Sequence, residues 1–140
     1  MPKSLAFLLN GLALTDSITN MVLISAITLA FKNYVNFQGR AGRGEYWWFA
    51  LASAIVATVT STLSATSSFY AAFYGLYVLA VFIPALSLAV RRLHDTDRSG
   101  FWLFLFLVPF FGVIILIVFL AQKGTPTANR FGTPPLQLTA

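Results

Sequence analysis

The sequence predicts an all-α membrane protein with three transmembrane helices, and three observations support this fold class. Of the 140 residues, 58% are hydrophobic and only 9% are charged, whereas a water-soluble domain has about 25% charged residues. The stretch from Tyr46 to Val90 contains no Asp, Glu, Lys, Arg or His, and it is long enough for two helices of about 20 residues each. A second uncharged run, from Ser99 to Gln122, is long enough for a third helix.

The first two spans are expected at about 46–63 and 69–90. A turn within 61–68 joins them, because this segment consists almost entirely of small and hydroxyl-bearing residues. Ala50, Ala54 and Ala57 lie on the first span. Small residues let helix backbones approach closely in lipid, so we expect this span to be packed centrally.

The third span is expected at about 101–121, where the sequence is bulky and apolar throughout. Pro109 has no amide hydrogen, and Gly112 follows it within one turn. We therefore expect a bend at this point of the third span. The tail at 122–140 contains Pro126, Pro134 and Pro135 and is expected to be irregular.

The N-terminal segment allows two interpretations. Apolar residues recur there at steps of three and four: Ile24, Ile27, Phe31 and Tyr34. This spacing predicts an amphipathic helix that lies along the inner membrane surface and precedes the three spans. The alternative is a fourth span over 5–31, which would place polar side chains in or near the bilayer at considerable cost. Those side chains are Asn10, Asp16 and Asn20.

These elements divide the chain into three parts. Residues 1–20 are expected to be an N-terminal extension, with Met21 as an alternative natural start. Residues 21–121 are expected to form a single helical membrane domain, followed by the irregular tail at 122–140.

Lys and Arg beside the spans predict the orientation, because these residues favour the cytoplasmic side. In a three-span chain, one side receives Lys3, Lys32, Arg40, Arg43, Arg91, Arg92 and Arg98. The other side receives only Lys123 and Arg130. We therefore expect the N-terminus in the cytoplasm and the C-terminus outside.

Two polar segments border the spans on the predicted inner side. The segment 37–49 enters the first span, and the segment 91–102 joins the second span to the third. If the first two spans form a hairpin, these segments meet at the inner surface. They give a candidate polar cluster with a structural or lipid-headgroup-binding role: Arg40, Arg43, Glu45, Arg91, Arg92, His94, Asp95 and Arg98.

The carboxylates of this cluster are expected to find partners, because a charge at the edge of a bilayer is costly unless it is paired. The expected partners of Glu45 are Arg91, Arg92, Arg40 and Arg43. For Asp95 they are His94, Arg98 and a backbone amide. Asp97 and Ser99 are the candidate caps of the third helix.

Three blocks of the sequence carry a family signature. They read GRAGRGEYWWF at 39–49, RRLHDTDRSGF at 91–101 and NRFGTPP at 129–135. Together they resemble the domain of unknown function 805 family of small bacterial inner-membrane proteins, from about Met21 to Pro135. The resemblance implies a multi-pass protein of the bacterial inner (plasma) membrane with three or four spans, and it brings no established activity.

The sequence departs from the family pattern at four positions. Gly42 stands where the family usually has serine, so a side-chain helix cap is missing there. Phe101 replaces a usual tryptophan. Asp97 stands where glycine is common, and Phe131 where tyrosine is common.

The sequence favours a non-enzymatic membrane protein, such as a scaffold, a partner subunit or an envelope component. It has no cysteine and no cofactor motif, so we predict no catalytic residues, no metal site and no cofactor. The net charge of +5 lies beside apolar spans. It therefore favours anionic membrane lipids as partners rather than nucleic acid, together with a homo-oligomer or a membrane-protein partner.

Two other functions are left open. One is an oligomeric transporter or channel component, although ion paths usually place charged groups within the membrane. The other is a lipid-headgroup-modifying enzyme, in which His94 acts as general acid or base and Asp95 orients it.

Overall fold

The computed structural model describes residues 3–135 of the chain, with side chains from residue 12 onward. It is all-α within this range, as predicted. The helices are α1 (Lys3–Lys32), α2 (Arg43–Ser64), α3 (Ser68–Asp95), the 3₁₀ helix η1 (Gly100–Leu107) and α4 (Phe111–Ala121).

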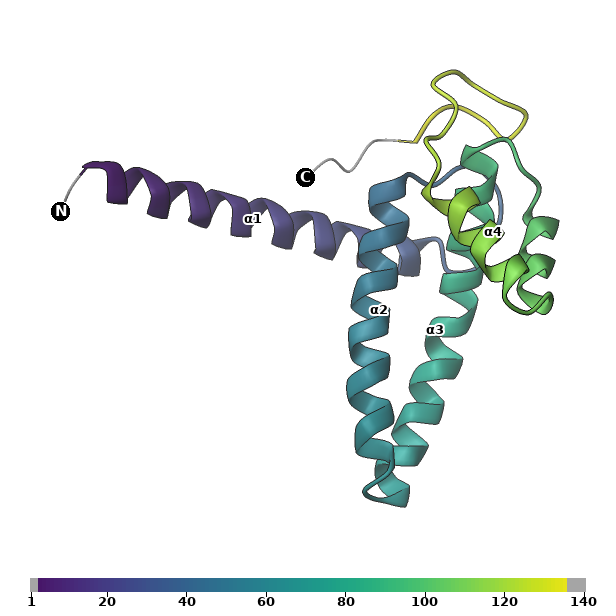
Figure 1. The fold of residues 1–140 in the computed structure, drawn as a ribbon, viewed down its shortest axis with the longest axis horizontal. Coiled ribbons are helices and arrows are strands. Elements are labelled where there is room, and N and C mark those ends of the chain that lie inside the picture. Colours follow the sequence, from purple (N-terminus) through teal and green to yellow (C-terminus); the bar gives the residue numbers. More distant parts are fainter. Residues whose placement is uncertain (1–2, 136–140) are drawn as a thin grey trace.

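The helices α2 and α3 form a long antiparallel hairpin with a short turn at its far end (Figure 1). Side chains such as Leu51, Ile55 and Leu79 are more than half exposed on its outer faces. The hydroxyl of Tyr77 donates to the Ser53 carbonyl at 2.8 Å and ties the two helices together. The predicted spans at 46–63 and 69–90 are therefore confirmed as a pair of helices suited to lipid.

The predicted third span at 101–121 is wrong. The segment is split into η1 and α4, which lie side by side against the upper part of α3 (Figure 1). The eight residues of η1 extend about 16 Å, and the 11 residues of α4 also extend about 16 Å. Each is about half of the 30 Å hydrocarbon core of a bilayer. The segment therefore forms two short helices that reverse direction at residues 108–110, and we call η1 and α4 together the re-entrant hairpin.

The break in the re-entrant hairpin has a local cause. Pro109 lies in the turn, and Phe110 takes φ +62°, a conformation that L residues disfavour. A methyl group added at Gly112 would overlap the Leu105 carbonyl. Gly112 thus permits the close approach of α4 to η1. The two residues that predicted a bend instead mark a complete reversal.

The tail returns to the end of the α2–α3 hairpin from which the re-entrant hairpin started (Figure 1). The Thr125 amide donates to the Asp95 carbonyl at 2.9 Å, and Asn129 donates to the His94 carbonyl at 2.9 Å. The third span is expected from sequence to carry the tail to the opposite side of the membrane; in the structure the tail instead lies at the end of the hairpin where residues 101–121 begin. The tail has little regular structure, as predicted.

The helix α1 runs crosswise to the α2–α3 hairpin and extends well beyond it (Figure 1). Ala26 and Ala30 are fully buried where α1 meets the hairpin. The Ser87 hydroxyl on α3 donates to the Asn33 carbonyl at 2.9 Å, just after α1. By contrast, Ile24 of the predicted apolar face is 64% exposed. The face of α1 that meets the protein therefore includes the small residues Ala26 and Ala30, whereas Ile24 faces outward.

Three helices are long and apolar enough to cross a membrane: Leu12–Lys32 of α1, Arg43–Ser64 and Ser68–Asp95. The first of these lies crosswise to the other two. The segment 101–121 is not among them.

Candidate functional site

The C-terminal tail contacts one end of the α2–α3 hairpin, and most of the charged side chains at this end are buried. This is unusual, because Arg, Asp and Glu are almost never fully buried unless they are paired. We call the group the charge network: Arg40, Glu45, Arg91, Arg92, His94 and Asp95. The structure thus brings six of the eight candidate residues together, from the loop before α2, the first turn of α2 and the last turns of α3.

Asp95 is the centre of the network, at the C-terminal end of α3. One carboxylate oxygen, Oδ1, accepts from Nε and Nη2 of Arg40 at 3.0 and 2.8 Å. The other, Oδ2, accepts from Nη1 of Arg92 at 2.5 Å. The expected partners His94 and Arg98 do not contact this carboxylate. The sequence could not show this, because Arg40 reaches it only through the folded hairpin.

Arg40 connects the centre of the network to the tail. Its side chain donates to the carbonyl oxygens of Thr125 at 2.6 Å, Thr127 at 2.8 Å and Gly132 at 3.3 Å. These bonds come in addition to the pair with Asp95. A buried guanidinium with its donors occupied in this way keeps the irregular tail in one conformation.

Gly124 brings the tail close to Asp95. A methyl group at this position would overlap both oxygens of the Asp95 carboxylate. Only glycine therefore allows the chain to pass over the centre of the network. The sequence does not single out this residue, since a glycine within a proline-containing tail is typical of any loop.

Arg92 connects the network to the re-entrant hairpin and is fully buried. Its Nε donates to the Leu120 carbonyl at 2.9 Å, and its Nη2 donates to the Gln122 carbonyl. Both acceptors lie at the C-terminal end of α4, where a cation interacts favourably with the helix dipole. Arg92 thus fixes the point at which the re-entrant hairpin returns.

Arg91 pairs with Glu45 across the α2–α3 hairpin, with Nη1 and Oε1 3.1 Å apart. This is one of the predicted pairings. The Ala41 amide also donates to the Arg91 carbonyl at 3.0 Å. The Nε and Nη2 atoms of Arg91 are buried without a hydrogen-bond partner within the described residues. The network holds three arginines and two carboxylates, and the excess positive charge lies at Asp95, which Arg40 and Arg92 share.

His94 faces the loop before α2 and the tail. Its Nδ1 lies 3.1 Å from the Gly39 carbonyl, and its ring stacks on Phe131 with 3.8 Å between centroids. Because a carbonyl oxygen only accepts, Nδ1 carries the hydrogen in this arrangement. Asp95 does not touch the imidazole, so the expected His–Asp pair is absent here.

Arg43 and Arg98 lie outside the network. Arg43 is exposed at the start of α2. Arg98 is partly exposed, and its guanidinium lies over the Phe119 ring at 4.1 Å. The Ser99 hydroxyl accepts from the Phe101 amide at the start of η1, which is one of the two predicted caps. Gly42 occupies the N-cap position of α2 without a side-chain cap, also as predicted.

The ionisable side chains of the network are engaged with one another, with main-chain carbonyls and with one aromatic ring. Both carboxylates are occupied by arginine, and the one histidine is held by a carbonyl and a phenyl ring. In the part of the chain that the structure describes, no group of three or more His, Asp or Glu residues is placed to hold a metal ion. The contacts join α2, α3, the re-entrant hairpin and the tail at one place.

A long apolar hairpin whose one end is closed by a buried charge network defines a multi-pass α-helical membrane protein. The chain belongs to the family described as "Protein of unknown function (DUF805)", whose model matches residues 34–133. The matched range contains the whole network and begins after α1.

Two proteins of Escherichia coli (strain K12) are similar to this chain. One is inner membrane protein YhaI, 50% identical over 105 residues that make up 74% of this chain and 89% of YhaI. The other is inner membrane protein YhaH, 47% identical over 109 residues that make up 74% of this chain and 90% of YhaH. No solved structure matches the chain. The chain is thus an inner-membrane protein with several candidate spans.

Proposed function

We propose that this protein is a non-enzymatic scaffold, partner subunit or envelope component of the inner membrane. The observation that carries this proposal is the use of the charged side chains. Arg40 and Arg92 donate hydrogen bonds to the Asp95 carboxylate and to main-chain carbonyls. A catalytic acid or base needs access to a substrate proton, whereas these groups hold four segments together.

The apolar outer surface supports an assembling role. The re-entrant hairpin and the outer faces of α2 and α3 expose side chains such as Phe104, Leu76 and Leu79. These surfaces are suited to lipid and to other membrane helices, and the network keeps their relative positions fixed. We infer that the partner is a membrane protein or a second copy of this chain.

The charge distribution supports a single orientation. Between Lys32 and Arg130, no Lys or Arg lies at the end of the α2–α3 hairpin formed by the turn at 65–67. All of them lie toward the opposite end, which carries the charge network. By the preference of these residues for the cytoplasmic side, the network end, the end of α1 and the tail at 122–135 face the cytoplasm. The helix α1 then lies along the inner surface, since it runs crosswise to the α2–α3 hairpin.

Exposed basic residues around the network then lie at the level of lipid headgroups. Arg43, Lys123 and the partly exposed Arg98 are available to anionic lipid, each worth about 1 kcal/mol near a charged surface. The buried arginines take no part in this attraction, because their donors face the protein.

The test is extraction of the native protein in small discs of its own membrane, followed by measurement of the particle mass. We expect a stable homo-oligomer or a stable complex with a second membrane protein. Asp95→Asn should lose this assembly, whereas the exposed Asp97→Asn should keep it. A wild-type protein that runs as a monomer with lipid alone would contradict the scaffold role.

The enzymatic alternative is tested at His94. His94→Gln retains a polar side chain of similar reach, and we expect it to leave the lipid composition of the membrane unchanged. A folded His94→Gln protein that alters the lipid composition would instead support a headgroup-modifying activity.

A further inference from the structure

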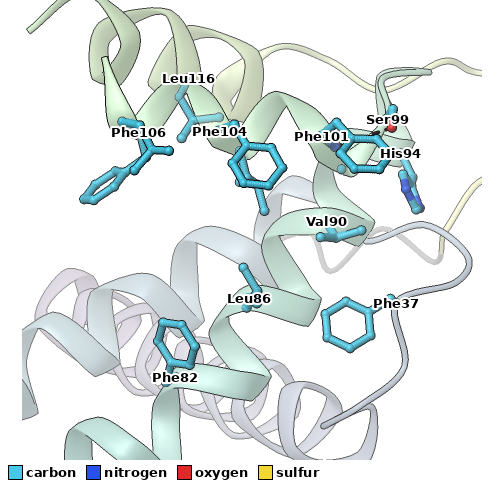
Figure 2. A pocket seen from close by; sticks show the side chains of 13 residues that line it. Phe37, Phe82, Leu86, Val90, His94, Ser99, Phe101, Phe104, Phe106 and Leu116 are labelled. Carbon is cyan, nitrogen blue, oxygen red and sulfur yellow. Dashed lines mark hydrogen bonds between the residues drawn. The ribbon is translucent and has the colours of Figure 1, made fainter. Parts of the chain in front are cut away.

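An apolar groove of about 750 Å³ runs between α3 and the re-entrant hairpin (Figure 2). Its wall on α3 is made by side chains at successive turns: Phe82, Leu86 and Val90. The opposite wall comes from η1 and α4, with Phe101, Phe104, Phe106 and Leu116 among its residues. The groove borders the charge network, because His94 belongs both to the network and to the lining of the groove.

The groove has one polar end. His94 and Ser99 lie there, and Phe37 lies close to that end (Figure 2). The Ser99 oxygen accepts from the Phe101 amide at 3.4 Å, and its own hydrogen has no acceptor among the described residues. Arg98 precedes Ser99 directly, and its charge is not paired with a carboxylate of residues 12–135.

We propose that this groove binds one acyl chain of an anionic phospholipid, whose phosphate lies at Ser99 and Arg98. The proposal goes beyond the scaffold role and does not rest on it. The site needs neither a partner protein nor the pairing within the charge network.

The depth of the groove matches one leaflet of a bilayer. From Phe82 to Val90, α3 rises about 12 Å, and half of the 30 Å hydrocarbon core is about 15 Å. The polar end is on the side of the charge network, where headgroups of that leaflet lie. The re-entrant hairpin covers the same half of the bilayer, so it forms a wall along the length of the chain.

The polar end distinguishes a phospholipid from a membrane helix of a partner. A phospholipid carries its polar group at one end of an apolar chain, as this groove has its polar side chains, His94 and Ser99, at one end. Arg98 precedes Ser99 in the chain and lies over Phe119, outside the lining of the groove. No hydrophobic force drives an acyl chain out of the bilayer into an apolar groove, because both surroundings are apolar. Selectivity must therefore come from close packing and from the headgroup charge.

The experiment uses the full chain in lipid discs that contain phosphatidylglycerol with a photoreactive group on one acyl chain, in a background of neutral lipid. After illumination, mass spectrometry locates the modified residues. We expect adducts to concentrate on groove residues such as Leu86 and Phe104, and to be sparse at Leu79, which is 73% exposed on the outer face of α3. Equal modification of Leu79 and Leu86 would overturn the proposal.

Two pairs of variants test the site further. Leu86→Trp fills the groove and should abolish the concentrated adducts, whereas Leu79→Trp, with the same change in size, should leave them. Arg98→Gln should lower the preference for the anionic probe over a neutral one about fivefold, the equivalent of about 1 kcal/mol per basic residue. If Leu86→Trp folds and keeps the wild-type adduct pattern, the groove does not hold the chain.

The alternative to a lipid in the groove is a segment of a second copy of the chain. Because the sequence has no cysteine, Leu86→Cys provides a single thiol in the groove. Disulfide formation between two Leu86→Cys chains, without lipid adducts in the groove, would assign the groove to an interface and overturn the proposal. A protein that assembles with partners but shows no groove adducts would leave the scaffold role intact and remove only the lipid site.

Discussion

Arg40 and Asp95, 55 residues apart in the chain, meet through two hydrogen bonds to one carboxylate oxygen. Their side chains are only 1% and 3% exposed. The pair joins the loop before α2 to the end of α3. The same arginine holds the tail, so one ion pair connects three segments of the protein.

Loss of the central carboxylate should destabilise the fold strongly. Asp95→Asn leaves Arg40 and Arg92 buried without a counter-charge, and removing one partner of a buried pair costs about 3–5 kcal/mol. The free energy of unfolding, measured by denaturant titration in mixed micelles, should fall by about this amount.

The matched control is Asp97→Asn. Asp97 pairs with Arg130 at 3.3 Å, but both side chains are about half exposed. An exposed pair contributes about 0–1 kcal/mol, so stability should change little. If the two variants lose the same stability, Asp95 is not the centre that the structure indicates.

The tail passes close to the Asp95 carboxylate at Gly124, and this contact predicts an effect on proteolysis of the tail. Gly124→Ala places a methyl group against the Asp95 carboxylate, so the tail must move away from the network. We expect faster trypsin cleavage after Lys123 and Arg130, two exposed sites within the tail. The rate is followed by mass spectrometry of the released peptide.

Gly75→Ala is the control for this change. Gly75 lies in α3, and a methyl group there meets nothing within 4 Å. The helix should gain up to about 1 kcal/mol from the better helix former, and tail cleavage should stay at the wild-type rate. Equal cleavage in wild type and Gly124→Ala would show that the tail is not held over Asp95.

The turn after α3 predicts a third effect, through the backbone. Asp97 has φ +58°, a left-handed conformation that glycine adopts freely and that costs other residues about 1–2 kcal/mol. This explains why glycine suits the position. Asp97→Gly should retain or raise the melting temperature, and Asp97→Val should lower it, because a β-branched residue is poorly tolerated there. A valine variant as stable as Asp97→Asn would contradict this reading.

The α2–α3 hairpin could be predicted because its signal is compositional. An uncharged run of this length is compatible with few structures other than a pair of apolar helices. The turn lies where the residues become small and polar. The helix α3 continues past Val90, where the sequence predicts its end, since Arg91 to Asp95 taken alone are typical of a loop. They remain helical to Asp95 because Glu45 in the first turn of α2 pairs with Arg91 and Arg40 in the loop before α2 pairs with Asp95.

The third span could not be predicted in the same way. Composition reports that residues 101–121 prefer an apolar environment, but it does not report how many times they cross it. Pro109 and Gly112 indicated a bend. The reversal depends on the contact of Gly112 with the Leu105 carbonyl and on the anchoring of Leu120 by Arg92, which are tertiary features.

The residues of the charge network were identifiable from sequence, but most of its pairings were not. Arg91 and Glu45 were an expected pair. The contact of Asp95 with Arg40 and Arg92, and the hold of Arg40 on tail carbonyls, involve long sequence separations and main-chain acceptors. Main-chain carbonyls leave no signature in a sequence.

The return of the tail to the network side is the central claim, and labelling of single cysteines in spheroplasts and inverted membrane vesicles tests it most directly. The positions are Ala128 in the tail, Gln38 before α2 and Ser67 in the turn, all exposed. A membrane-impermeant maleimide added outside spheroplasts should label Ser67→Cys alone. The same reagent added to inverted vesicles should label Gln38→Cys and Ala128→Cys. Labelling of Ala128→Cys from the same side as Ser67→Cys would show that residues 101–121 cross the membrane, and it would contradict the re-entrant hairpin.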